Sequence, residues 1–202
     1  FDRVDLALTT HVHSDHFSAS VAGDFLARNP RALLAGPRDV HVQLALYAPE
    51  LPDIEARIVG CQPEWGRTVD LTFRGVRIKI LGLRHADEVN FETPHQAYLV
   101  ELEGYRILHL GDALPTAENF EPFAWLEKTP LDVVLMPEWF LRDPDGKALI
   151  DRFFKARRFV LIHLGPGVED RVLDLARQRI PPAAETMVFR RSLEKMRFID
   201  SL

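Results

Sequence analysis

The chain has 202 residues, an apolar fraction of 47% and a formal net charge of −5 at pH 7. That length suits one domain with a substantial core, so we expect a single domain over residues 1–202. The acidic balance makes nucleic acid an unfavoured partner, because neutralising phosphates needs a basic surface. No stretch approaches the ~20 uninterrupted apolar residues of a membrane span. Cys61 is the single cysteine, so an intrachain disulfide is excluded, and we expect a reducing, cytoplasmic location.

The first part of the chain predicts alternating short strands and helices. Ser18 can cap a helix, and Pro37 suits the first turn of another. The elements expected here are a strand at 6–8, a helix at 18–28, a strand at 32–35, a helix from 37, and irregular chain over 49–63.

Two hairpins are predicted next, followed by an α/β pattern. Arg74-Gly75 and Glu103-Gly104 each separate two apolar runs by two residues, which is typical of tight hairpin turns. The strands expected around them are 68–73, 76–81, 96–102 and 105–110. The later elements expected are helices at 118–127, 147–154 and 169–177 and strands at 132–136, 159–162 and 186–189. This order indicates an α/β fold.

The segment Thr10-His11-Val12-His13-Ser14-Asp15-His16 carries the strongest chemical signal. Loops between a strand and a helix usually favour Gly, Ser and Asn over histidine, so packing alone explains this cluster poorly. Alternation along an extended chain directs His11 and His13 to one side. If the chain turns just after His13, Asp15 and His16 can serve a second position. Imidazole nitrogens and a carboxylate in this pattern predict metal ligands.

Further ligands are expected where later strands end. His85, Asp112 and His163 each follow an apolar run. Loops beyond strand ends are where α/β proteins build their sites, so these three side chains become candidates together with the first cluster. His109 lies within an expected strand and His41 on an expected helix, and we interpret both as structural or surface residues.

The pattern His-x-His-x-Asp-His, then a lone His, Gly-Asp, and a His after an apolar strand resembles the metallo-β-lactamase superfamily. The resemblance implies an α/β fold of the metallo-β-lactamase αββα type. It implies two divalent metal ions, with zinc favoured and manganese, iron or nickel as alternatives. The implied ligand sets are His11, His13 and His85 for one ion and Asp15, His16 and His163 for the other, with Asp112 bridging.

His95 is an alternative to His85. We prefer His85 because it directly ends a strongly apolar run, whereas His95 opens the next strand and is expected to line a substrate pocket. Glu138, Trp139 and Phe140 follow the strand that ends at Pro137 and are the other candidates for that pocket. Ordinary core packing of the two aromatic residues is the equally weighted alternative.

Gly111-Asp112-Ala113 and the run Leu131-Asp132-Val133-Val134-Leu135-Met136-Pro137 look like the lactonase-like branch that includes ascorbate-6-phosphate lactonase. The resemblance implies a hydrolase that uses a metal-bound hydroxide to cleave an ester, lactone or phosphoester of a small molecule. Asp112 and Asp15 would be its catalytic carboxylates, and Asp15 could guide the proton of the attacking water. The alternatives are an iron-dependent oxidoreductase or dioxygenase and a non-catalytic, metal-binding remnant.

The resemblance also predicts self-association. Members of the family usually have several strands before the first histidine motif, whereas few residues precede it here, so we expect a sandwich that is truncated at the N-terminus. An uncovered sheet face or edge favours association, so we expect that the chain does not work as an isolated monomer. Either a partner copy covers the sheet in a homo-oligomer, or the 202 residues are the downstream part of a longer polypeptide. Light scattering at micromolar concentration measures this. A non-aggregating monomer with a cooperative melt would contradict the expectation.

Overall fold

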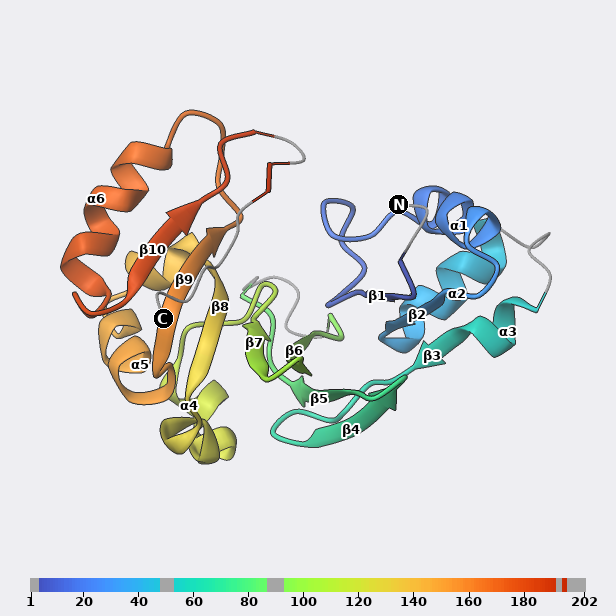
Figure 1. Cartoon of the computed structure of the whole chain (residues 1–202), viewed down its shortest axis with the longest axis horizontal. Helices are drawn as coiled ribbons and strands as arrows, with labels where there is room; N and C mark the ends of the chain where they lie inside the picture. The colour runs from blue at the N-terminus through green and yellow to red at the C-terminus, as the bar shows by residue number, and fades with distance from the viewer. Residues whose placement is uncertain (1–3, 48–52, 87–92, 192–193, 196–202) are drawn as a thin grey trace.

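The computed structural model describes residues 4–47, 53–86, 93–191 and 194–195. Its strands form two sheets with the spatial orders β1-β2-β3 and β10-β9-β8-β7-β6-β5-β4 (Figure 1). The strands are β1 (Leu6–Leu8), β2 (Leu33–Gly36), β3 (Ile58–Gly60), β4 (Thr68–Phe73), β5 (Val76–Gly82), β6 (Gln96–Leu102), β7 (Tyr105–His109), β8 (Leu131–Pro137), β9 (Ala156–Ile162) and β10 (Glu185–Val188). The helices are α1 (Ala19–Arg28), α2 (Arg38–Tyr47), α3 (Ile54–Arg57), α4 (Ala117–Phe120), η1 (Glu121–Lys128), η2 (Glu138–Leu141), α5 (Gly146–Phe153) and α6 (Glu169–Arg179). Within the described ranges, every helix is too short or too polar to cross a bilayer.

Three apolar clusters correspond to the three interfaces of an αββα sandwich. One joins the larger sheet to α4, α5 and α6, and a second joins the smaller sheet to α1 and α2. The third lies between the sheets, where Leu6 and Leu8 of β1 pack against Ile78 and Ile80 of β5. The period of two along β1 and β5 sends alternate side chains into different layers, which confirms the expected α/β fold.

Strand direction gathers the ends of β5, β7, β8 and β9 at one edge of the larger sheet. β5 and β7 are both antiparallel to β6, so they run in the same direction, and β8 and β9 continue it in parallel. β6 runs the opposite way, so its beginning lies at the same edge. Side chains that follow β5, β7, β8 and β9, or precede β6, are therefore brought together.

Both predicted hairpin turns are confirmed. Phe73 pairs with Val76, and Leu102 pairs with Tyr105. The two central residues of each turn have positive φ, at 49° and 85° in the first and 51° and 84° in the second. This is the turn whose twist matches that of the flanking strands, and glycine at its second position adopts it without steric cost.

Two sequence expectations were wrong. The helix expected over 118–127 is divided into α4 and η1, because Pro122 lies at the start of η1 and Phe123 has non-helical dihedrals. The stretch expected to be irregular contains α3 and β3 between residues 54 and 60, while residues 49–52 lie outside the described ranges. β3 is formed by pairing with β2. The buried Arg57 of α3 donates hydrogen bonds to the carbonyl oxygens of Leu26 and Asn29, at 2.7 and 2.6 Å.

A buried tyrosine ties the two sheets together beside the histidine motif. Tyr98 of β6 is 1% exposed, and its hydroxyl donates to the carbonyl oxygen of Thr9, 2.7 Å away. The amide N–H of Gln96 donates to the carbonyl oxygen of Thr10 at 3.0 Å. The chain that leads into the histidine motif is thus anchored to the larger sheet by its backbone.

We expect Tyr98→Phe to lower the free energy of unfolding by about 1–3 kcal/mol, because the backbone carbonyl of Thr9 and the side-chain amide of Gln96 would each lose a buried hydrogen-bond partner. Tyr47→Phe is the matched control, since Tyr47 is 72% exposed, and it should change stability by less than about 0.5 kcal/mol. Denaturant unfolding of both variants measures the difference. If the two variants are equally stable, the hydrogen bonds of the Tyr98 hydroxyl contribute nothing to stability.

Candidate metal centre

The histidine motif lies in the loop between β1 and α1. The amides of His16 and Phe17 both donate to the carbonyl oxygen of His13, at 2.9 and 2.8 Å. The chain therefore turns directly after His13, which is the condition under which Asp15 and His16 can serve a second position. Ser18 then begins α1, with its side chain accepting from the amide of Val21.

The other three candidates follow β5, β7 and β9, and two of them are held together by backbone pairing. His85 forms an isolated bridge with Ala113. The amide of Ala86 donates to the carbonyl oxygen of Asp112 at 2.8 Å. His163 has a φ of 60°, a left-handed conformation that is uncommon outside glycine and that clusters at functional sites.

The candidate ligands form two groups, each with ligand atoms within 4.8 Å of one another. The first group holds His11, His13 and His85, and the Nε2 atoms of His11 and His85 lie 3.3 Å apart. His11 and His85 are buried. The hydroxyl of Thr10 lies 3.0 Å from His11 Nδ1, which leaves Nε2 facing the group.

The second group holds Asp15, His16, Asp112 and His163. His163 Nε2 lies 3.2 Å from an Asp15 oxygen, and His16 Nε2 lies 3.2 Å from Asp112 Oδ1. The other Asp112 oxygen lies 3.8 Å from His11 Nε2 and 3.7 Å from His85 Nε2. The Asp112 carboxylate therefore lies between the two groups, where a bridging ligand would be.

The spacing of these atoms fits divalent cations. Two nitrogens bound to one tetrahedral zinc ion at ~2.0–2.1 Å are separated by ~3.3–3.4 Å. The His11–His85, His16–Asp112 and His163–Asp15 separations all lie within about 0.2 Å of that value. Without a cation, one of these rings can donate to the other at 3.3 Å, depending on its tautomer, and a cation between them would take the place of that proton.

Burial and neighbouring charges keep the centre ready for cations. Burial is the main cause that lowers the pKa of His11 to about 2, His95 and His16 act in the same direction, and Asp112 opposes them. Burial also acts to lower the pKa of His16, but Asp112 outweighs it through a hydrogen bond and its charge, so the pKa is raised. Burial acts to raise the pKa of Asp112, yet His16, His163 and His11 hold it below its usual range. His11 is therefore a neutral nitrogen donor and Asp112 an anion near pH 7.

His95 lies at the same edge but in a different role. Its ring is 5% exposed, and Nε2 accepts a hydrogen bond of 2.9 Å from the amide of Asp112. A side-chain carbon on Gly111, whose φ is 56°, would come within 2.7 Å of that nitrogen. The structure therefore places His85, and not His95, in the first group. Contrary to the sequence expectation, His95 is not among the residues that line the cavity beside the centre.

Asn119 is a residue that the sequence reading missed. It is fully buried, and its amide group accepts from the Arg84 amide at 2.9 Å and donates to the carbonyl oxygens of Arg84 and Leu114, at 3.1 and 3.0 Å. These contacts fix the backbone beside both His85 and Asp112. An asparagine in an expected helix looks like a surface residue, so no signal in the sequence identifies it.

A cavity of about 600 Å³ opens beside the centre. Trp139 lines it as expected, donates from Nε1 to the Ala113 carbonyl at 3.1 Å, and packs edge-on against His163. Phe140 is fully buried in the core and does not line the cavity, which corresponds to the alternative of ordinary core packing. Glu138 is buried beneath the wall, where it pairs with Arg142, a lining residue that the sequence reading did not select.

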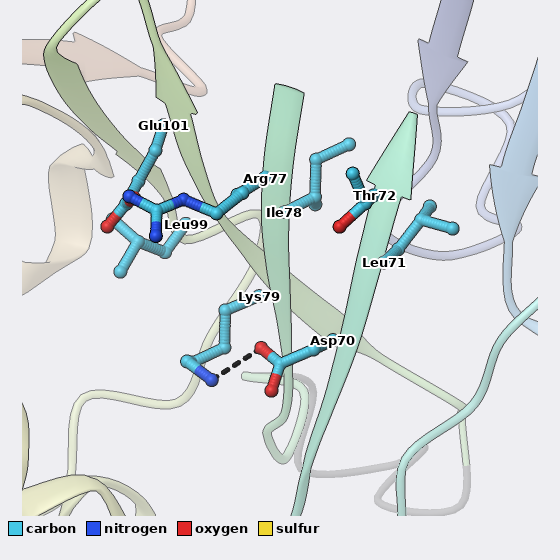
Figure 2. A pocket seen from close by; sticks show the side chains of 8 residues that line it. All are labelled: Asp70, Leu71, Thr72, Arg77, Ile78, Lys79, Leu99 and Glu101. Atoms are coloured by element: carbon cyan, nitrogen blue, oxygen red, sulfur yellow. Dashed lines mark hydrogen bonds and ion pairs between the residues drawn. The ribbon is translucent and has the colours of Figure 1, made fainter. Parts of the chain in front are cut away.

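A second hollow, of about 310 Å³, lies over β4, β5 and β6 (Figure 2). It is lined by Arg77 and Lys79 near the start of β5, whereas His85 follows the other end of that strand. Its cations are paired with its own carboxylates, Lys79 with Asp70 and Arg77 with Glu101. The cavity beside the histidines is therefore the better candidate for chemistry.

His109 and His41 lie outside both groups. His109 ends β7, where its Nδ1 accepts from the Gly111 amide at 2.9 Å, and burial lowers its pKa to about 4, with His16 adding to the effect. His41 lies on α2.

Comparisons with known proteins agree with this geometry. Residues 1–178 match the family model described as a beta-lactamase superfamily domain. Curated protein sequences gave no match. Yeast PDE1 aligns over 94% of this chain and 67% of its own, with a TM-score of 0.67 and 15% identity. Igni18, a metallo hydrolase from Ignicoccus hospitalis, aligns over 92% and 76%, with a TM-score of 0.60 and 16% identity. CmlA, a diiron β-hydroxylase from Streptomyces venezuelae, aligns over 93% and 44%, with a TM-score of 0.62 and 12% identity. At these identities the likeness establishes a shared fold.

We expect His85→Ala to weaken divalent-metal binding by at least about 10–100-fold, because it removes one of three converging nitrogens. His95→Gln is the matched comparison and should retain the metal stoichiometry of the unchanged protein. Equilibrium metal titration measures both. Loss of an ion from His95→Gln, with none lost from His85→Ala, would reverse the assignment.

Proposed function

Because the chain belongs to the β-lactamase superfamily, we propose that it is a metal-dependent hydrolase that cleaves an ester, lactone or phosphoester with water. One observation carries the proposal: two ligand groups share the Asp112 carboxylate and open on a cavity of about 600 Å³. That volume is typical of sites for small molecules.

We propose that His11, His13 and His85 hold one ion, and that Asp15, His16 and His163 hold a second, with Asp112 between them. Zinc is the favoured metal because nitrogen donors dominate the two groups. Two bound divalent ions would supply a water of lowered pKa and polarise the oxygen of the bond to be cleaved.

The two carboxylates have different surroundings and therefore different proposed roles. Asp112 is 5% exposed and stays ionised, so it holds the two groups at a fixed separation. The side chain of Asp15 is 58% exposed and lies 3.2 Å from His163. A carboxylate that faces solvent at this position can take up the proton of the attacking water and release it.

The cavity wall positions the substrate. Trp139 packs against the ring of His163 and presents an aromatic surface, and Leu114, Pro115 and Pro144 extend that apolar wall. The sequence runs around Asp112 and before Pro137 support assignment to the lactonase-like branch, which would make a cyclic or open ester the preferred substrate.

Oxidation at iron is the second candidate. The structure described as a diiron β-hydroxylase shares this fold, and histidine and carboxylate ligands suit iron as well as zinc. Metal analysis of the purified protein separates the two: two zinc or manganese ions per chain favour hydrolysis, and bound iron favours oxidation.

We expect the double variant His11→Ala/His13→Ala to lose bound metal and all hydrolysis of a panel of esters, lactones and phosphodiesters. The reason is that two of the three nitrogens of the first group are removed. His41→Ala is the matched control, because His41 lies on α2 outside both groups. Elemental analysis and the panel are run on all three proteins.

Full metal occupancy in the double variant would place the site elsewhere. Bound metal in the unchanged protein without hydrolysis of any panel member would support a non-catalytic, metal-binding role instead.

A further inference from the structure

Arg142 lines the cavity beside the metal centre, and we propose that its guanidinium binds an acidic group of the substrate. The substrate would then be an ester or lactone that carries a carboxylate or phosphate away from the bond that is cleaved. This inference rests on the proposed hydrolysis and specifies the class of molecule that enters the site.

Arg142 lies in the same cavity as three of the candidate metal ligands. The residues that line the cavity include His85, Asp112 and His163 at one end and Arg142 at another, so both belong to one volume of about 600 Å³. Among the described residues that line the cavity, Arg142 is the one with an Arg or Lys side chain. A molecule of modest size can therefore contact the metal ligands and the guanidinium at once.

Contacts with neighbouring residues orient the Arg142 side chain. It follows η2, where its backbone amide donates to the Trp139 carbonyl at 3.0 Å. Its guanidinium pairs through one terminal nitrogen with Glu138, a residue that is only 8% exposed. The arginine side chain is 53% exposed, so the remaining N–H groups of its planar fork can bind an anion in two places.

The acidic groups near Arg142 have partners within the same segment of the chain. Asp143 also lines the cavity, and its Oδ1 accepts the Asp145 amide at 2.9 Å. Glu138 lies behind Arg142 and restrains the guanidinium. Two divalent ions would carry more charge than the ligands Asp15 and Asp112, so the metal end of the cavity also favours an anion.

The test compares two esters that differ in one remote group, mono-para-nitrophenyl glutarate and para-nitrophenyl valerate. For the zinc-loaded protein, Arg142→Gln should lower kcat/KM for the glutarate ester about tenfold, mainly through a higher KM, because a charged hydrogen bond is lost at a half-exposed site. The valerate ester should be unaffected. Arg142→Lys should restore part of the preference, since it keeps the charge but loses the fork.

Arg152→Gln is the matched control, because Arg152 lies on α5 and pairs with Glu121 and Glu127 away from the cavity. It should change neither ester. If Arg142→Gln slows both esters equally, or neither, Arg142 does not select for charge and the inference is overturned while the hydrolase remains.

Calorimetric titration with glutarate and with propyl phosphate gives a second readout that needs no hydrolysis. We expect the unchanged protein to bind either anion about tenfold more tightly than the Arg142→Gln variant does. The anion that the unchanged protein binds more tightly identifies carboxylate or phosphate as the recognised group. Binding that depends on Arg142 without cleavage of any ester would retain the inference and remove the proposed hydrolysis. Equal binding by both proteins would overturn the inference.

Discussion

The close approach of the candidate ligands, where the loop after β1 meets the loops after β5, β7 and β9, is the constraint on which the rest of the structure depends. Five imidazole rings and two carboxylates meet there. The Nε2 atoms of His11 and His85 face each other at 3.3 Å, a separation that also suits two nitrogen ligands of one cation. Hydrogen bonds to Asn119 hold the loops of His85 and Asp112, and the Tyr98 tie holds the chain before His11. Preorganisation of this kind is what a metal site requires, because ligands must be close before a cation arrives.

The two ligand groups differ in their exposure to solvent, and that difference suits a division of labour. His11 and His85 are buried, whereas Asp15 and His163 of the other group reach solvent. A dry environment strengthens the interaction between a cation and its ligands. An open group admits water and substrate. Asp112 belongs to the open group, and its second oxygen lies 3.7 Å from His85 Nε2, so a single carboxylate lies between the open group and the buried one.

Strand direction explains why the cavity wall and the candidate metal centre lie together. β5, β7, β8 and β9 all run the same way, so the loops that follow them share one edge. Trp139, which follows β8, therefore reaches His163, which follows β9. Arg142 lies three residues beyond Trp139 and remains in the same wall.

The sequence by itself determined the two hairpins, through the local chemistry of their turns, and the α/β class, through the order of its strands and helices. It also supplied the seven ligand candidates that the structure brings together in two groups. A two-residue turn needs glycine at its second position, and a cluster of histidines and an aspartate has few uses besides metal binding. Only the tertiary structure separated His85 from His95. His85 follows β5 and His95 precedes β6, and these two strands are antiparallel, so both histidines lie at the same edge of the sheet. The folded chain then brings the ring of His85, and not that of His95, to His11 and His13. Phe140, Asn119 and Arg142 were also beyond sequence reasoning, since packing and contacts between distant segments decide whether such side chains enter a core, a hydrogen-bond network or a cavity wall. β3 was missed for the same reason: a strand of three residues is defined by its partner, not by its own pattern.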